Sequence, residues 1–199
     1  MTIKRDLEFL YEIGCLRFLQ RTWKQFLNPD AQNISEHTFK VIWIALILAK
    51  YEKTASEDKI IKMALIHDLP ESRTGDVHYV SRLYTERKEG EAIRDIFINT
   101  SFADEFVKIW REYEERKCPE AKIVKDADTL DVELELNEQE ARGHKLKDIW
   151  FKKRGKIVFK KLFTKAARKF WQEIKRSNPH DWHLKGNNRF NSGDWREKK

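Results

Sequence analysis

The sequence is poor in the residues that interrupt regular structure, with only 7 Gly and 4 Pro among 199 residues. This scarcity excludes a collagen-like chain, low-complexity disorder and an all-β chain built on Gly/Pro turns. The two cysteines, Cys15 and Cys118, form neither a CxxC motif nor a disulfide framework, so we expect a reducing, cytoplasmic location. The longest apolar run, 41–49, is too short to span a bilayer. Residues 1–10 lack the apolar stretch of a secretory signal, so we expect neither membrane insertion nor secretion.

Charge is unevenly distributed along the chain, although the net value is +7. Residues 151–199 carry 16 Lys/Arg and 4 Asp/Glu, which leaves 24 and 29 for residues 1–150. A basic C-terminal part suggests an anionic partner, nucleic acid included. A solvated amphipathic helix followed by a loose end explains the same charges and is the simpler interpretation.

Apolar residues recur at helical spacing over most of the chain, and no segment alternates as a strand does. We therefore predict an all-α domain, 1–178, followed by a polar basic tail, 179–199. The final long helix carries an apolar residue at every fourth position, from Val158 to Ile174. Ser35, Ser56 and Pro119 are the expected start signals of three other helices. The predicted helices cover 6–26, 35–50, 56–69, 86–98, a segment after 104, 119–143 and 157–176, with a loop at 71–81.

Three of these helices place a polar residue on an apolar face. His37 shares a face with Val41 and Leu48, and His67 follows Ala64 by three positions and is followed by Asp68. On the helix that starts at Pro119, Asp128 lies between Val124 and Val132 at intervals of four. A buried imidazole or carboxylate is costly unless it is paired or binds a metal ion.

Two imidazoles and two carboxylates that converge from three helices could bind one divalent cation and leave positions for water and substrate. Imidazole suits transition metals and carboxylates suit harder ions, so Mn, Co, Zn, Fe, Ni and Mg all remain open. Each residue alone has a plainer explanation, because a single histidine on an apolar face is more often a core residue with its hydrogen bonds satisfied.

Four short motifs together resemble the HD-domain superfamily of metal-dependent phosphohydrolases, in the branch of the 5'-deoxynucleotidases. The motifs are SEHTF (35–39), IHDLPE (66–71), TGD (74–76) and VKDAD (124–128). The resemblance covers about 6–145 and implies an HD-type helical bundle. The implied metal ligands are His37, His67, Asp68 and Asp128, with Asp126 as the alternative if the register slips by two.

The resemblance also implies roles for residues around the metal. Glu71 matches the catalytic acid/base, and Asp76 matches a residue that orients substrate and attacking water. Arg21 resembles the phosphate-binding arginine, and Trp23 resembles the tryptophan that contacts the sugar. The family usually has that arginine and tryptophan adjacent, whereas this chain has Thr22 between them, which leaves a preference for 2'-deoxy substrates open.

The reaction that follows from the resemblance is release of phosphate from nucleoside 5'-monophosphates. The ion would lower the pKa of its bound water, and the resulting hydroxide would attack phosphorus. Arg21 would neutralise phosphoryl oxygens, and Glu71 would exchange the proton. Two alternatives remain open: hydrolysis of another phosphate ester or anhydride, and a non-catalytic module that binds a nucleotide or nucleic acid. Members of this branch are commonly dimers, so a homodimer is expected.

Overall fold

The computed structural model describes residues 2–27, 29–53 and 55–185, and this part of the chain is all-helical, as predicted. Within it no β-strand forms, and one isolated bridge pairs Gln20 with Asn33. The α-helices are α1 (Ile3–Gly14), α2 (Ile34–Glu52), α3 (Glu57–Ile66), α4 (Glu71–Thr74), α5 (Glu89–Phe97), α6 (Ala103–Glu115), α7 (Pro119–Ala141), α8 (Leu146–Lys161), α9 (Lys165–Ile174) and α10 (Asp181–Leu184). Short 3-10 helices cover Cys15–Phe18, Thr22–Gln25 and Ser81–Leu83.

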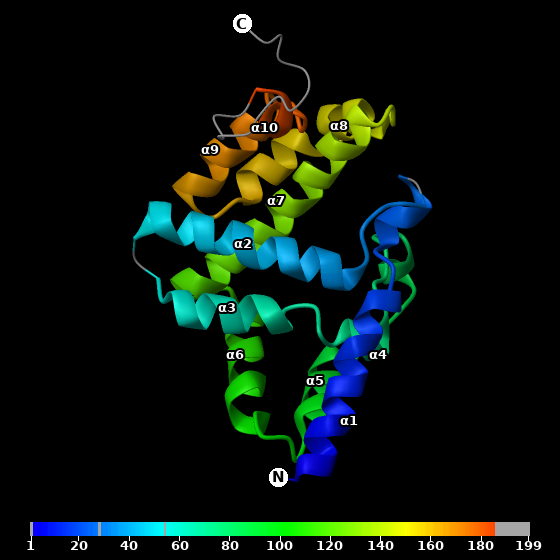
Figure 1. Cartoon of the computed structure of the whole chain (residues 1–199), viewed down its shortest axis with the longest axis vertical. Coiled ribbons are helices and arrows are strands. Elements are labelled where there is room, and N and C mark those ends of the chain that lie inside the picture. Colours follow the sequence, from blue (N-terminus) through cyan, green and yellow to red (C-terminus); the bar gives the residue numbers. More distant parts are fainter. Residues whose placement is uncertain (1, 28, 54, 186–199) are drawn as a thin grey trace, which may run out of the picture.

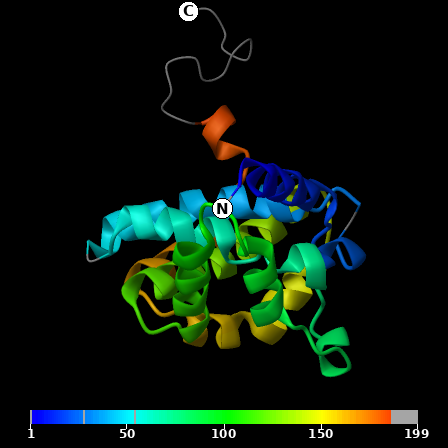
Figure 2. The ribbon, with the colours of Figure 1, turned by 90° about the horizontal axis from the view of Figure 1, so that it is seen from below.

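Helix α7 lies at the centre of the bundle, and α2 crosses it (Figure 1). The main core joins buried side chains of α2, α3, α5, α6, α7, α8 and α9, with Val41, Ile60, Ile96 and Leu130 fully buried among them. Seen from below (Figure 2), α1 and α2 lie along one side of the molecule. The centre of the bundle is therefore where a residue on α2, α3 or α7 can meet a residue on another of these helices.

Local signals explain how three of the helices begin. The Asn33 side chain accepts from the Glu36 amide while the Glu36 carboxylate accepts from the Asn33 amide, a capping box that begins α2. The predicted start at Ser35 is therefore two residues late. The Ser56 hydroxyl accepts from the Lys59 amide and begins α3, as expected, and Pro119 is the first residue of α7.

Two predicted helices are interrupted in the structure. In the segment 6–26, α1 ends at Gly14. The rest of the segment contains two short 3-10 helices in place of the predicted α-helix. The basic helix expected at 157–176 is two helices, because the Asp126 carboxylate accepts hydrogen bonds from the amides of Phe163 and Thr164. These two amides are thus satisfied without helical partners, and the Thr164 hydroxyl caps α9.

Three further differences concern segments that were not predicted as helices. The segment 71–81, expected as a loop, begins with α4, which ends at Gly75 with a positive φ of 74°. Helix α8 begins eleven residues before the predicted start at 157. Of the predicted tail 179–199, residues 181–184 form α10, and 186–199 lie outside the described residues.

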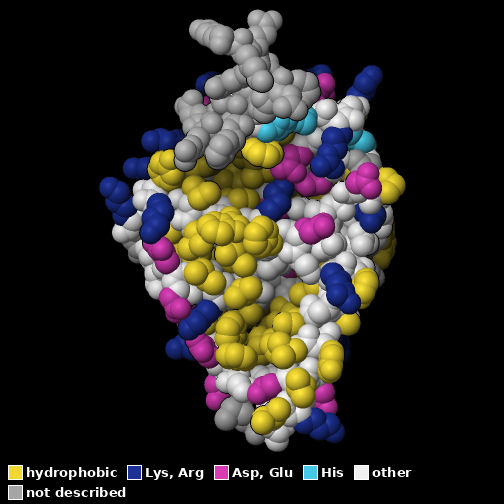
Figure 3. Space-filling model, in the orientation of Figure 1, with side chains coloured by type: hydrophobic (Ala, Val, Ile, Leu, Met, Phe, Trp, Pro, Cys, Tyr) yellow, Lys and Arg dark blue, Asp and Glu magenta, His cyan; other side chains and the backbone are white. Residues whose placement is uncertain are grey.

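Hydrophobic side chains are also exposed on one face of the bundle (Figure 3). They include Phe39, Trp43 and Ile47 on α2 and Ile61 and Leu65 on α3. We call these five residues the α2–α3 apolar face. Among the described residues, no helix has both the length and the apolarity needed to cross a bilayer.

Candidate metal centre and active site

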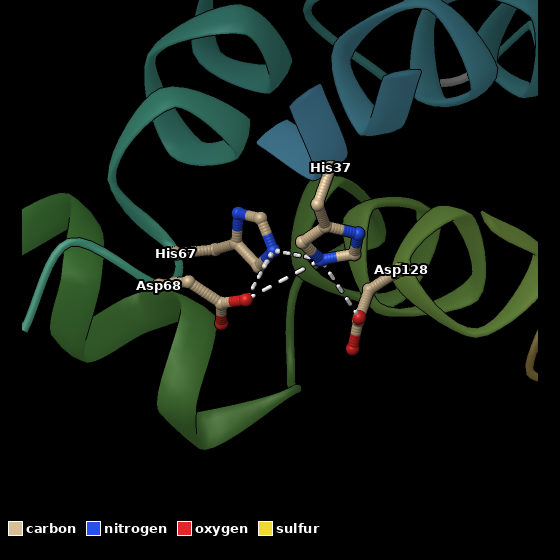
Figure 4. Close-up of side chains that lie close together, drawn as sticks. All are labelled: His37, His67, Asp68 and Asp128. Atoms are coloured by element: carbon tan, nitrogen blue, oxygen red, sulfur yellow. Dashed lines mark hydrogen bonds and ion pairs between the residues drawn. The ribbon is translucent and has the colours of Figure 1, made fainter. Parts of the chain in front are cut away.

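The four predicted ligands meet at one point inside the bundle (Figure 4). His37 extends from α2, His67 and Asp68 follow the end of α3, and Asp128 extends from α7. One ligand atom from each residue lies within 4.8 Å of all the others. The His37 Nε2 atom is 3.3 Å from His67 Nε2, from Asp68 Oδ2 and from Asp128 Oδ1. Ligand atoms at these separations could bind a single ion.

The hydrogen bonds of the two imidazoles direct both Nε2 atoms toward this point. His67 Nδ1 donates to the carbonyl oxygen of Ala64 at 2.8 Å. His37 Nδ1 donates to Asp131 Oδ2 at 2.6 Å. Because each Nδ1 carries a proton, each neutral ring presents a lone pair at Nε2, as histidine ligands of metals do. Two lone pairs 3.3 Å apart repel one another unless a proton or a metal cation lies between them. Two imidazole nitrogens and two carboxylates are a donor set that fits a transition metal ion.

The electrostatics of the cluster also favour a central positive charge. Burial and nearby Arg21 oppose protonation of His37, but hydrogen bonds to Asp128, Asp131 and Asp68 hold its pKa well above the usual value. Burial would raise the pKa of Asp68 and Asp128, yet neighbouring cationic groups and hydrogen bonds hold both well below the usual range. The cluster therefore stabilises the carboxylates as anions and attracts a proton or a metal cation to His37.

Asp131, which the sequence analysis did not identify, fixes the orientation of His37. It is fully buried, accepts a 2.5 Å hydrogen bond from Gln32 Nε2 and lies 3.5 Å from Lys40 Nζ. Its position three residues after Asp128, on the same buried face of α7, is the signal that could have found it. It is thus the outer partner that a metal-binding histidine normally requires.

Asp131→Asn is expected to weaken metal affinity about 10- to 100-fold, because an amide holds the His37 imidazole less strongly than a carboxylate does. The measurement is a metal titration by isothermal calorimetry on chelator-treated protein.

Asp126→Asn is the matched control on the same helix, because the Asp126 carboxylate binds residues 163 and 164 and not the metal cluster. This variant should lower the free energy of unfolding by about 1–3 kcal/mol and leave metal affinity unchanged. Equal metal affinities for wild type and Asp131→Asn would show that Asp131 has no part in the site.

The structure brings Asp128, and not the alternative Asp126, into the cluster.

Glu71 lies at the start of α4 and is 5% exposed. Arg87 Nη1 donates to its Oε1 atom at 3.3 Å, while the buried Oε2 atom has no hydrogen-bond partner among the described residues. Burial, followed by the negative charges of Asp68 and Asp76, raises the pKa of Glu71 to about 9. A carboxyl group with a raised pKa holds a proton near neutral pH, as an acid catalyst must.

Arg21 and Asp76 lie beside the same cluster. Arg21 is 7% exposed, and its Nη1 donates to Asp68 Oδ2 at 3.1 Å. Its Nε lies 3.8 Å from Asp76 Oδ2, which accepts a 2.8 Å hydrogen bond from the Thr22 amide. A guanidinium has five N–H donors, so Arg21 keeps donors for an anion at this position.

Two cations beside the site were not identified from the sequence. Lys125 Nζ donates to Asp128 Oδ2 at 2.6 Å, one helical turn before it on α7. Arg87 contacts Glu71 from the segment that precedes α5. Lys125 is visible within the VKDAD motif, whereas no pattern in the sequence marks Arg87. Trp23, which the resemblance implies as the sugar contact, packs its ring edge-to-face on Trp150, with centroids 4.9 Å apart.

Comparison with known proteins agrees with this geometry. The family model described as "HD domain" matches residues 13–171. The chain is 32% identical over 183 residues to 5'-deoxynucleotidase HDDC2 of Dictyostelium discoideum, covering 86% of this chain and 93% of that protein. It is 28% identical over 160 residues to the human protein of the same name, covering 76% and 78%.

Solved structures show the same fold. A conserved hypothetical protein from Pyrococcus furiosus superposes with a TM-score of 0.74 at 24% identity, covering 86% of this chain and 99% of that one. A predicted metal-dependent phosphohydrolase from Magnetospirillum magnetotacticum superposes with a TM-score of 0.66 at 25% identity, covering 87% and 93%. The family match over most of the chain, together with four converging ligands in the order His, His-Asp, Asp, shows that this chain belongs to the HD-domain family.

Proposed function

We propose that this chain is a metal-dependent phosphohydrolase that releases phosphate from nucleoside 5'-monophosphates, deoxyribonucleotides included. The observation that carries the proposal is the convergence of four metal-ligand atoms within 4.8 Å. The relatives named 5'-deoxynucleotidase support the substrate class. A divalent ion bound there supplies Lewis acidity to a phosphoryl oxygen and makes water more acidic.

Arg21 binds and orients the phosphate in this proposal. Its guanidinium is buried, and Asp68 and Asp76 hold it next to the metal cluster. A guanidinium matches two phosphoryl oxygens with two parallel N–H bonds, which fixes phosphorus relative to the ion. Asp76 maintains this geometry from the other side, because it also accepts the amide proton of Thr22.

Glu71 handles the proton in this proposal. Departure of the sugar 5'-oxygen is favoured when that oxygen receives a proton in the transition state. Glu71 holds a proton near neutral pH, and its Oε2 atom has no hydrogen-bond partner in the described part of the chain. Arg87 binds the other oxygen, Oε1, and keeps the carboxyl group in place.

The function is tested by removing metal with a chelator and then adding Mg, Mn, Co, Ni or Zn singly. Phosphate release is measured for ribo- and deoxyribonucleoside mono-, di- and triphosphates. We expect no release from the stripped protein and recovery with at least one ion, with monophosphates preferred. Protein passed through the same steps without chelator is the control.

Three results of this experiment would contradict the proposal. Release that survives metal removal would exclude a metal-dependent reaction. Release from di- and triphosphates alone would identify an anhydride hydrolase. No release with any ion, together with a nucleic-acid gel shift that fades as salt rises, would favour a binding module that uses the basic residues of 151–199.

A second copy of this chain is the partner that we infer. The α2–α3 apolar face supports a homodimer, since Trp43 is 56% and Phe39 64% exposed. Large exposed apolar patches are unusual on monomers.

The cytoplasmic location also stays a prediction, and the free thiols of Cys15 and Cys118 agree with it. The division into a domain of residues 1–178 and a tail stays a prediction as well.

A further inference from the structure

Five aromatic side chains from three separate segments meet beside the proposed active site. Trp23 and Trp150 pack edge-to-face at 4.9 Å between ring centroids. Tyr79 lies 6.4 Å from Trp150 and 6.2 Å from Phe26, which itself packs on His78 at 5.6 Å. We call these five residues the aromatic cluster. The phosphohydrolase mechanism proposed above gives none of them a role.

The aromatic cluster is fixed to the active site through the backbone. The Thr22 amide and hydroxyl donate to the side chain and to the carbonyl oxygen of Asp76, both at 2.8 Å. Arg21, the proposed phosphate-binding residue, precedes Thr22, and Trp23 follows it. Tyr79 comes three residues after Asp76. The segments that follow Arg21 and Asp76 therefore start side by side at the proposed phosphate-binding position. Each carries aromatic rings within five residues of its start.

The members of the cluster differ in burial. Trp23 and Trp150 are partly buried and pack against a small core that contains Leu27 and Leu136. Tyr79 is 62% exposed, although rings pack against it from two sides. The packing role in the cluster therefore falls on Trp23 and Trp150. Tyr79 instead keeps much of its surface open to a ligand.

Arg154 makes the buried side of this cluster rigid. Its guanidinium carbon lies 4.8 Å from the Trp150 ring centroid and 5.8 Å from that of Trp23. Such cation–π contacts hold the indole rings in place. Trp150 thus gives Tyr79 a fixed support, and little freedom would be lost when a planar group binds.

We propose that Tyr79 is a specificity-determining residue that stacks on the nucleobase of the substrate, with Trp150 as its support. The inference rests on the proposed function, because it assigns the base of a nucleoside monophosphate whose phosphate lies at Arg21. Stacking on an aromatic ring is tolerant of base identity, since every base has a π face. The site should therefore accept several bases and discriminate against phosphate esters that have none.

The test compares 2'-deoxyadenosine 5'-monophosphate with 2-deoxyribose 5-phosphate, which has no base, using the full chain loaded with metal. Tyr79→Ala should raise KM for the nucleotide roughly tenfold, with a much smaller change in kcat. KM for the base-free substrate should hardly differ from that of the wild type. Tyr79→Phe keeps the ring and should retain the wild-type KM. Tyr84→Ala is the matched control, since Tyr84 is 85% exposed in the same segment.

The outcomes separate this inference from the proposed function. An unchanged nucleotide KM in Tyr79→Ala overturns base stacking and leaves the phosphohydrolase intact. Equal KM values for both substrates in the wild type also overturn base stacking and leave the proposed phosphohydrolase function intact. If the metal-loaded wild type releases phosphate from neither substrate, the proposed function itself is wrong and the inference fails with it.

Discussion

Asp68→Asn is expected to lose bound metal and to reduce phosphate release by at least about 10³-fold. The substitution preserves the size of the side chain but removes a carboxylate that lies 3.3 Å from both imidazole Nε2 atoms. The same carboxylate also holds Arg21 at 3.1 Å, so the phosphate-binding group loses its anchor as well. Metal catalysis supplies several kcal/mol of transition-state stabilisation, and each 1.36 kcal/mol is a factor of ten in rate. Metal content after dialysis and initial rates on a nucleoside monophosphate check this prediction.

His67→Ala should give the same two losses, because it removes a nitrogen ligand from the same point. His144→Ala is the control, since His144 lies in the turn after α7 and is not among the four ligands. Circular dichroism on all variants establishes that the helices remain. Wild-type turnover in either Asp68→Asn or His67→Ala would show that the metal assignment is wrong.

Glu71→Gln is expected to keep the metal and lose turnover by about 10²- to 10⁴-fold, the usual contribution of a general acid or base. Glutamine has the shape of glutamate and can still accept the hydrogen bond from Arg87. It has no acidic proton to give to the leaving oxygen, so the chemical step should fail while the site stays assembled. Metal content and kcat, measured on the same preparation, separate the two effects.

The pH dependence gives a second test of Glu71. A general acid acts only while protonated, so the rate should fall as pH rises through its pKa. Burial and the neighbouring carboxylates raise that pKa from 4.5 to about 9, and a bound cation lowers it by its charge. The falling limb is therefore expected above the ordinary range of a glutamate and no higher than about pH 9, and Glu71→Gln should lack it. Normal turnover in Glu71→Gln, with this limb retained, would exclude Glu71 from proton transfer.

Helical periodicity was sufficient to predict the fold class, and together with the motif resemblance it predicted the four candidate metal ligands. His37 and Asp128 could be found because each lies on an apolar stripe, and polar residues on such stripes need a partner. The order of the motifs then grouped them with His67 and Asp68. All four candidate ligands lie on or at the ends of helices that contribute to the central core, so apolar periodicity could mark them and the motif resemblance could group them.

Contacts between distant segments account for what the sequence did not predict. The break between α8 and α9 depends on Asp126, which lies 37 residues before Phe163. The apolar spacing continues across the break, because side chains before and after it are buried in the same core. They include Val158, Leu162 and Ile174. Local periodicity indicates that these side chains are buried. It cannot indicate that the distant carboxylate of Asp126 satisfies the backbone amides of Phe163 and Thr164.

The same limit applies to the outer parts of the site. Arg87 meets Glu71 across 16 residues of chain, and Trp150 meets Trp23 across more than a hundred. Neither pair shares a helix or a motif, so no spacing rule connects its members. Asp131 is different, because its place on α7 beside Asp128 was visible in the sequence.

The candidate ligands come from two distant parts of the chain, residues 37–68 and Asp128 on α7, so an ion held by all four would also be a cross-link. A species that binds the native protein and not the unfolded chain stabilises the fold by about 2.7 kcal/mol when its free concentration is one hundred times its Kd. Such an increment is a large part of the net stability of an ordinary domain. The supply of metal in the surroundings thus sets how long this protein survives heat or proteolysis, in addition to how fast it works.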